Sequence, residues 1–253
     1  MREPIFAANW KMHKTVTETR DYFQIFLPLI EGIKKKRVII APPFTALSYA
    51  KKAASDNPRI SISAQNMHYE NEGAFTGEIS PVMLNELGIS HVIIGHSERR
   101  HVFNEDDGVI SMKIEAAIVH GISPIFCIGE TLSEREKKLT FAVLEKQISK
   151  GLSRTKKDKM GSLVIAYEPV WAIGTGVTAT PGQAQDAHEF VRSSIHKLFN
   201  SSIANDIRIL YGGSVKPENI KELMQQPDID GVLVGGASLN PESFAKIANY
   251  ELN

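Results

Sequence analysis

The sequence predicts an α/β protein built as a (β/α)8 TIM barrel, with eight parallel strands inside a layer of eight outer helices. Short apolar runs rich in β-branched residues alternate with longer stretches whose apolar residues recur at intervals of three and four. Runs such as Val38–Ile40 and Val92–Ile94 are continuously apolar, which is typical of parallel strands buried on both faces. Eight such units in 253 residues favour a closed barrel over an open doubly wound sheet.

The strand-forming runs recur from one end of the sequence to the other. They are Ile5–Trp10, Arg37–Ala41, Ile60–Ala64, His91–Ile94, Ser123–Ile128, Leu163–Tyr167, Ile207–Tyr211 and Gly231–Val234. No linker or low-complexity tract separates them, so residues 1–253 are predicted to form a single barrel domain. Parallel strands end on one rim, where barrels of this kind carry their chemistry.

The helical pattern is clearest in three of the intervening stretches: Thr17–Ile30, Ser133–Lys150 and Pro181–Leu198. Capping residues predict helix starts at Ser80-Pro81, at Ser133 with Glu136, and at Thr180-Pro181. A capping hydroxyl accepts a bond from an amide that the helix leaves unpaired, and proline at the first position has no amide to satisfy.

The composition argues against several classes of partner. Lys and Arg together number 29, as do Asp and Glu, so the net charge gives no reason to expect nucleic acid or a membrane surface. No apolar run approaches the ~18 residues of a spanning helix, and no signal-peptide pattern precedes the first strand. The one cysteine, Cys127, fits a reducing compartment and is interpreted as a packed small residue. A cytoplasmic location is expected.

The first predicted strand ends in two polar residues. Asn9 and Lys11 are two positions apart, so on a strand they would share the face that points into the barrel mouth. A buried lysine is costly unless it meets an anion, which makes Lys11 a candidate for binding an anionic substrate. The alternative is that the chain has already left the barrel and that Lys11 is solvated.

The fourth strand runs into Gly95-His96-Ser97-Glu98-Arg99, where His96 can serve as an acid or an electrophile. A short helix starting there would direct its amide dipoles at the ring and lower the pKa of His96. The alternative is a hydrogen-bonded core histidine, which is the interpretation we favour for His91, His120 and His188. The density of charge around Glu98 indicates a structured polar network.

The sixth strand ends at Glu168, which Pro169 holds outside the helical region, so that its carboxylate leaves the strand toward the mouth. The apolar segment Val170–Ile173 follows, and then Gly174 and Gly176. An apolar loop with glycine hinges is typical of a lid that closes over substrate and excludes water. A packed surface loop with a solvated glutamate is the alternative, which three large apolar residues in a solvated loop disfavour.

Glycine pairs follow the last two strands. Gly212-Gly213-Ser214 comes after the seventh strand, and Gly235-Gly236 comes after the eighth. Either pair alone is more often a simple turn. Together, at the rim where barrels of this class bind phosphate through backbone amides, they predict an oxyanion site.

Taken together, these motifs resemble the triosephosphate isomerase family. The resemblance rests on Ala8–Lys11, Gly73–Glu78, Gly95–Arg100, Ala166–Gly176 and Tyr211–Ser214, and it extends over nearly all of residues 4–250. It implies an enzyme that interconverts dihydroxyacetone phosphate and D-glyceraldehyde 3-phosphate through an enediolate, in glycolysis and gluconeogenesis. It implies no metal and no organic cofactor.

The resemblance also implies a role for each residue of the site. Glu168 would be the base that removes a proton from the carbon next to the carbonyl, and His96 the neutral electrophile that polarises that carbonyl. Lys11 would stabilise the enediolate charge, with Asn9 adding a hydrogen bond and Glu98 lying beside the lysine as a further member of the catalytic group. The phosphate would meet backbone amides of Gly174, Ser214, Gly235 and Gly236. Two other contacts are implied: Glu130 with Trp171, and Arg192 with Asp228.

The segment Gln65–Ile79 is long for a strand–helix connection, which usually has about 2–6 residues. Its tip carries Phe75 without a run of charge, a liability unless another surface covers it. By the resemblance, this loop inserts beside the active site of a second subunit in a homodimer, where Thr76 reaches the end of the first strand. A self-packed loop on a monomer is the alternative.

Two other functions share some of these features. Another phosphate-binding barrel isomerase or an aldolase would have the glycine pairs, but would not need the lid together with Asn9, His96 and Glu168. A catalytically silent binding protein could use the same fold, and loss of Lys11 or Glu168 would indicate it. Both residues are present, so the sequence favours an aldose–ketose isomerase acting on a triose phosphate.

Overall fold

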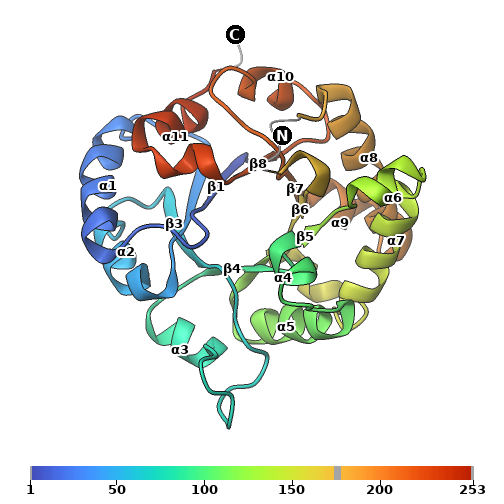
Figure 1. Ribbon diagram of the computed structural model, residues 1–253, viewed down its shortest axis with the longest axis horizontal. Helices are drawn as coiled ribbons and strands as arrows, with labels where there is room; N and C mark the ends of the chain where they lie inside the picture. The colour runs from blue at the N-terminus through green and yellow to red at the C-terminus, as the bar shows by residue number, and fades with distance from the viewer. Residues whose placement is uncertain (1, 174–177, 252–253) are drawn as a thin grey trace.

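The computed structural model describes residues 2–173 and 178–251, whose strands close into a barrel (Figure 1). Each strand pairs in parallel with the next, and β8 returns to pair with β1. The strands are β1 Ile5–Asn9, β2 Arg37–Ala41, β3 Ile60–Ala64, β4 His91–Ile94, β5 Ser123–Ile128, β6 Val164–Tyr167, β7 Arg208–Tyr211 and β8 Gly231–Val234. The predicted (β/α)8 architecture is confirmed, with strand bounds within one residue of those expected.

Helices follow every strand and form the outer layer. They are α1 Val16–Leu29, α2 Leu47–Ala53, α3 Pro81–Glu86, α4 Ser97–His101, α5 Asp107–Val119, α6 Leu132–Glu136, α7 Thr140–Gly151, α8 Pro181–Leu198, α9 Ser201–Asp206, α10 Ile220–Met224 and α11 Pro241–Ala248. Short 3-10 turns are η1 Phe44–Ala46, η2 Lys157–Ser162, η3 Val170–Ala172 and η4 Gly236–Leu239. Ser80 and Thr180 cap α3 and α8 as predicted.

The helix predicted over Ser133–Lys150 is wrong as a single element. Two helices, α6 and α7, occupy this stretch, because Lys138 adopts a left-handed backbone with a φ of 59° that ends the first helix. The predicted cap is also wrong by two positions. Thr131, not Ser133, caps α6, and its partner in the capping box is Glu134.

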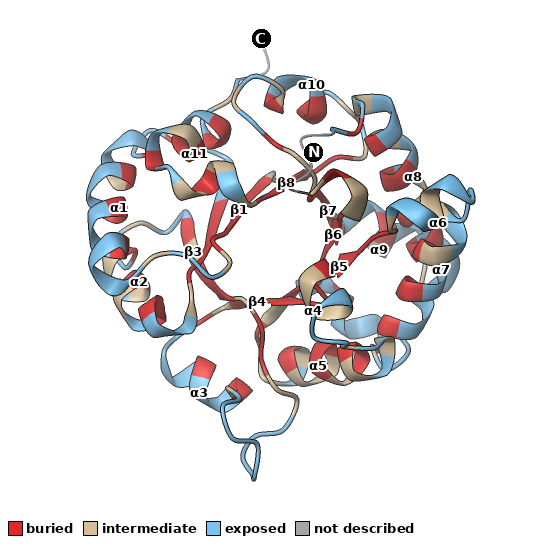
Figure 2. Ribbon diagram, in the orientation of Figure 1, coloured by how far each residue is buried: buried red, intermediate tan, exposed pale blue. Residues whose placement is uncertain are grey.

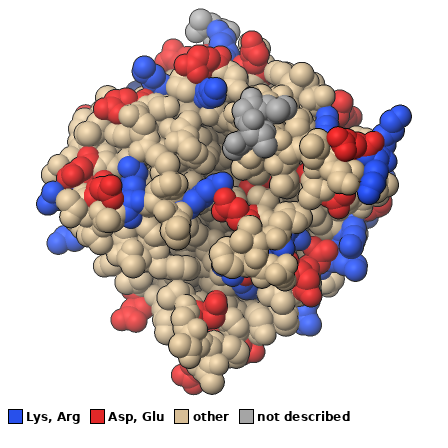
Figure 3. All heavy atoms as spheres, viewed as in Figure 1, with Lys and Arg blue, Asp and Glu red and all other residues tan. Residues whose placement is uncertain are grey.

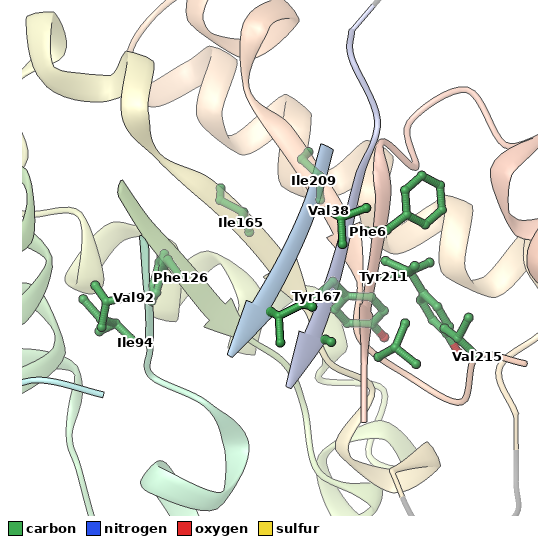
Figure 4. Packing of buried hydrophobic residues seen from close by; sticks show 14 of the residues in the cluster. Phe6, Val38, Val92, Ile94, Phe126, Ile165, Tyr167, Ile209, Tyr211 and Val215 are labelled. Atoms are coloured by element: carbon green, nitrogen blue, oxygen red, sulfur yellow. The ribbon is translucent and has the colours of Figure 1, made fainter. Parts of the chain in front are cut away.

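The core has two parts, because successive residues of a strand point to opposite faces of the barrel wall. Ile5, Ala7, Val164, Ala166 and their neighbours on other strands form a cluster inside the barrel. The alternate residues pack outward under the helices, as Figure 4 shows for several strands. Figure 2 shows the same division, with the strands and the inner sides of the helices buried. Extended by two positions along β1 and β6, the inward series leads to Asn9 and Glu168 at the mouth.

One connection projects well beyond the barrel. The loop of residues 65–79 between β3 and α3 forms the protrusion at the bottom of Figure 1, and its tip is exposed. The rings of Tyr69 and Phe75 lie 4.3 Å and 4.2 Å from the ring of His68, which stiffens the loop. Across the described ranges, no helix is both long enough and apolar enough to cross a membrane.

Candidate active site

A cavity of about 320 Å³ lies at the C-terminal ends of the strands. Segments that follow β1, β4, β6, β7 and β8 line it, so residues far apart in sequence meet there. Figure 3 shows one basic and one acidic group side by side near the middle of this face. The cavity lining includes most of the predicted site: Asn9, Lys11, His96, Glu168, Ser214, Gly235 and Gly236.

Lys11 reaches the cavity by a different route from the one predicted. β1 ends at Asn9, and Lys11 has a left-handed backbone with a φ of 52°, so the two residues do not share a strand face. The Asn9 side chain instead accepts a hydrogen bond from the Lys11 amide at 3.0 Å, and Gln65 donates to the Lys11 carbonyl at 2.8 Å. These bonds hold a conformation that lysine rarely adopts, and such strain is common at functional sites.

Glu98 lies behind Lys11 and does not line the cavity. Its carboxylate is 2.7 Å from the Lys11 ammonium and 3.6 Å from Nδ1 of His96. The Glu98 side chain is 46% exposed, so this ion pair fixes direction more than it adds stability. Glu98 therefore orients Lys11, whereas Lys11 itself faces the cavity.

His96 enters the mouth because the residue before it breaks the strand alternation. Gly95 has a φ of 73°, a backbone that disfavours any side chain, and a Cβ there would approach the Cys127 carbonyl to 3.1 Å. His96 then caps α4, and its Nδ1 accepts the Glu98 amide at 3.2 Å. An accepting Nδ1 places the proton of the neutral ring on Nε2, which points toward Glu168.

Glu168 is buried, and both of its carboxylate oxygens have partners. One oxygen accepts the Ser97 amide at 3.0 Å, and the other lies 3.0 Å from Nε2 of His96. Burial would raise the pKa of this carboxyl, but the histidine, the Ser97 amide and the charge of Lys11 together hold the pKa of Glu168 below its ordinary value. Glu168 is thus an ionised carboxylate at neutral pH, as a general base must be.

The expected lowering of the His96 pKa is wrong for this unliganded site. Burial and the amide at Nδ1 both disfavour the charged ring. The carboxylate of Glu168 outweighs them, helped by that of Glu98, and the pKa of His96 lies above its ordinary value. The prediction considered the helix alone and omitted the carboxylate that the fold brings from β6.

The segments that follow β7 and β8 contribute two glycine pairs to the cavity lining. Ser214 follows β7, and Gly235 and Gly236 follow β8 at the start of η4, as predicted. Among the described residues, no atom lies within 4 Å of a Cβ placed on Gly236. Gly174, the remaining predicted phosphate contact, lies outside the described residues.

Comparisons with known proteins agree with this arrangement. The model of the family described as triosephosphate isomerase matches residues 4–251. The chain belongs to the triosephosphate isomerase family. Proteins named triosephosphate isomerase from Geobacter metallireducens and Carboxydothermus hydrogenoformans are 55% and 53% identical over 251 and 247 residues. These matches cover 99% and 98% of this chain, and 100% and 98% of the relatives. One from Dictyoglomus turgidum is 50% identical over 244 residues, 96% of this chain and 98% of its own.

In this member of the triosephosphate isomerase family, a buried carboxylate anchors the base of the predicted lid. Glu130 accepts the Trp171 indole N–H at 2.9 Å and the Tyr167 hydroxyl at 3.1 Å, so the expected contact of Glu130 with Trp171 is confirmed. Arg135 pairs with Glu130 at 3.2 Å and lies 4.3 Å from the Trp171 ring centroid. Residues 174–177, which include Gly176 of the predicted lid, lie outside the described ranges.

Most predictions for residues away from the cavity also hold. Arg192 and Asp228 form the expected ion pair, at 2.6 Å. His91 and His188 are buried core histidines, hydrogen-bonded to Ser90 and to the Asp228 carbonyl respectively. The core prediction is wrong for His120, which ends α5 and is only partly buried. Cys127 is fully buried, and burial raises the pKa of its thiol well above the ordinary value. Within the described ranges, no cluster of three or more His, Cys, Asp or Glu is arranged to hold a metal ion.

Two residues in or beside the cavity were not predicted as site residues. Lys216 lines the cavity beside Ser214, and its only sequence signal was to be the sole cation among residues 212–219. Gln65 was predicted only as the start of a loop, although it bonds the Lys11 carbonyl. Support of this kind depends on contacts between distant segments, which no local pattern reveals.

Proposed function

We propose that the chain is a triose-phosphate isomerase that interconverts dihydroxyacetone phosphate and D-glyceraldehyde 3-phosphate. The observation that carries the proposal is the convergence of a carboxylate, an imidazole and an ammonium on one cavity that two glycine pairs also line. Glu168, His96 and Lys11 supply the three groups, and Gly235 and Gly236 form one of the pairs. Family membership supports the same activity, because the relatives are named triosephosphate isomerase.

In the proposed reaction, Glu168 takes a proton from the carbon next to the substrate carbonyl. The C–H electron pair becomes the C=C bond of an enediolate, and the carbonyl oxygen takes up negative charge. A proton then moves from the hydroxyl oxygen to the former carbonyl oxygen by way of His96, and return of the proton from Glu168 to the former carbonyl carbon completes the isomerisation. The Glu168 carboxylate contacts His96 and the Ser97 amide. A substrate bound between Glu168 and His96 would replace the contact between these two side chains.

His96 and Lys11 would stabilise the charge that develops on oxygen. Nε2 of His96 carries the proton in the neutral ring and can donate it toward either substrate oxygen, while the ammonium of Lys11 supplies fixed positive charge. Both groups are held before substrate arrives: His96 by the Glu98 amide, and Lys11 by the Glu98 carboxylate. Preorganised charges of this kind lower the barrier without rearrangement during the reaction.

The phosphate would bind the segments after β7 and β8 through main-chain N–H groups of Ser214, Gly235 and Gly236. Lys216 would add a positive charge beside it. Gly174, the remaining predicted contact, lies outside the described residues. The phosphate takes no part in bond making. Its binding holds the reacting carbon near Glu168, which converts an encounter into a positioned reaction.

The test is a coupled assay with glyceraldehyde 3-phosphate as substrate, in which the dihydroxyacetone phosphate formed is reduced by NADH. Rapid conversion at neutral pH, unchanged by a metal chelator, is expected. Another barrel isomerase, an aldolase or a silent binding protein would give no such conversion. Absence of turnover by folded protein would contradict the proposal.

The loop of residues 65–79 supports a second proposal, that the chain is a homodimer. Phe75 is 42% exposed and Thr76 is exposed at the tip, so a rigid, partly apolar projection stands in solvent in a single chain. An exposed apolar projection fits insertion into a pocket on another subunit. The base of the loop contacts the site, since Gln65 bonds the Lys11 carbonyl. Insertion at the partner's Lys11 would therefore support its catalytic geometry.

Thr76→Arg tests the homodimer by adding a long cation at the proposed interface. We expect a monomer in sedimentation and much lower activity, although no group lining the cavity is changed. Thr76→Ser, which keeps the hydroxyl and the size, is the matched control and should remain dimeric and active. A dimeric, fully active Thr76→Arg protein at nanomolar concentration would rule out the interlocking loop.

A further inference from the structure

We propose that Gln147, on α7, is a positioning residue for the reaction, because it fixes Gly129 and, through Gly129, the main chain of Glu168. This role rests on the proposed function. Gln147 does not touch the cavity, and its side chain lies between the outer helix and the end of β5. Its effect on the reaction would come entirely through the wall against which the base is built.

Gln147 holds Gly129 at both of its main-chain polar groups. The Gly129 N–H donates to Oε1 of Gln147 at 2.8 Å, and Nε2 of Gln147 donates to the Gly129 carbonyl at 3.1 Å. Gln147 is 8% exposed and both bonds are buried. A side-chain amide has the donor and the acceptor that this pair of groups requires, whereas an apolar side chain would leave both groups of Gly129 without these bonds.

Gly129 in turn packs against the backbone of Glu168 with no space between them. A Cβ placed on Gly129 would lie 1.7 Å from the Glu168 carbonyl oxygen and 2.7 Å from its carbonyl carbon. Hydrogen bonds between β5 and β6 flank this contact. The Glu168 amide donates to the Ile128 carbonyl at 2.7 Å, and the Val170 amide donates to the Glu130 carbonyl at 3.1 Å.

The other side of Glu168 is closed as well. A Cβ on Gly212 would lie 2.9 Å from Cγ of Glu168, and the Gly212 amide bonds the Tyr167 carbonyl at 2.7 Å. Glu168 therefore stands in a slot between two glycine backbones. Gly212 follows the strand β7, whereas Gly129 is additionally clamped by a side chain from the helix layer.

A shift of Gly129 would thus move Glu168, and a base is sensitive to small displacements. A misplacement of ~1 Å can cost ~100-fold in rate, so a fraction of that displacement is expected to cost about tenfold. Substitution of Gln147 should lower kcat and leave KM nearly unchanged, because the proposed phosphate contacts come from the segments after β7 and β8, to which Gln147 makes no hydrogen bond. This split separates positioning from a purely structural role.

Gln147→Met tests the proposal, since methionine has a similar length and no hydrogen bonds to offer. We expect kcat to fall about tenfold with KM within about twofold. The matched control is Gln185→Met. Gln185 donates to the Asp228 carboxylate at 2.7 Å and accepts the Asp228 amide at 3.1 Å, and neither residue lines the cavity, so this variant should lose stability and keep kcat. Urea unfolding of both proteins shows whether the losses of stability are comparable.

A double-mutant cycle with Glu168→Asp gives the readout that a structural role would not move. If Gln147 acts through Glu168, its substitution costs much less once the base is already displaced, so the two effects combine less than multiplicatively. Independent, multiplicative effects would overturn the proposal, as would a Gln147→Met kcat within twofold of the parent. Should Gln147→Met fail to fold, Gln147→Glu keeps the acceptor for the Gly129 amide, and a parental kcat there would also overturn it. An inactive parent protein would instead count against the proposed function.

Discussion

The strand ends that line the barrel mouth differ in whether they present side chains or main chain to the cavity. The ends of β1, β4 and β6 present side chains, namely Lys11, His96 and Glu168, each held by partners before any ligand arrives. The ends of β7 and β8 present backbone around Gly235 and Gly236. Side chains can take and give protons, whereas backbone amides can only donate hydrogen bonds. The proposed function assigns the chemistry to the first group of residues and phosphate binding to the second.

Substitution of the side chains after β1, β4 and β6 should lower kcat. Glu168→Asp withdraws the carboxylate by one methylene, and we expect a fall of ~100-fold in kcat with little change in KM. Steady-state kinetics with both substrates checks this. Near-normal turnover would mean that the base lies elsewhere and that the proposed assignment of the chemistry to these side chains is wrong.

Substitution of the glycines after β8 should raise KM. Gly236→Asp introduces a carboxylate where a Cβ meets no described atom within 4 Å, so the fold should tolerate it while the phosphate is repelled. We expect KM to rise at least about tenfold above that of Gly236→Asn, the neutral variant of the same size, with a smaller effect on kcat. The gap between these variants should shrink at high salt. Equal KM values would remove the phosphate from the segment after β8.

The smallest expected effect concerns the pH dependence of stability at His188, a residue of α8 that packs against Tyr167 of β6 and Tyr211 of β7. Burial lowers the pKa of His188 from 6.5 to about 3, and that of His91 to about 4. The unfolded chain therefore takes up protons that the folded chain excludes, and stability is lost as pH falls below 6.5.

His188→Asn, which keeps a donor for the Asp228 carbonyl, should flatten this pH dependence. Each buried histidine contributes a slope of up to about 1.4 kcal/mol per pH unit below its unfolded pKa, and the variant loses one such contribution. Urea unfolding between pH 6.5 and about 4 measures the difference. An unchanged slope of unfolding free energy against pH would show that His188 takes up its proton in the folded chain. The kcat of His188→Asn at neutral pH should equal that of the parent.

Sequence patterns predicted the barrel well because most strands are buried on both faces and leave nearly continuous apolar runs, such as Val38–Ile40 and Val92–Ile94. They also located Asn9, His96 and Glu168, since polar groups at strand ends stand out against such runs. They failed where geometry depends on single backbone angles: Lys11 leaves the strand, and Lys138 divides one predicted helix into two. The His96 pKa was misjudged because the carboxylate that raises it against the effect of burial is that of Glu168, after β6 and about 70 residues away.

The supporting contacts could not be read from sequence for a related reason. Gln65 and Gln147 are ordinary helix or loop residues by pattern, and only the closed barrel brings the first to Lys11 and the second to Gly129. Gly129 itself resembles a turn residue until the carbonyl of Glu168 is seen against it. Close approach between backbones depends on the register of β5 with β6, which is a tertiary property.

The most direct test of the account is isomerisation of dihydroxyacetone phosphate in D₂O, followed by NMR. Proton abstraction by Glu168 predicts that the glyceraldehyde 3-phosphate formed carries solvent deuterium on the carbon next to the carbonyl, because a carboxyl proton exchanges with solvent. Glu168→Gln, which has no basic carboxylate, should lose both turnover and exchange. Deuterium incorporation at the parental rate in Glu168→Gln, or turnover by the parent without any incorporation, would contradict the assignment of Glu168 as the base.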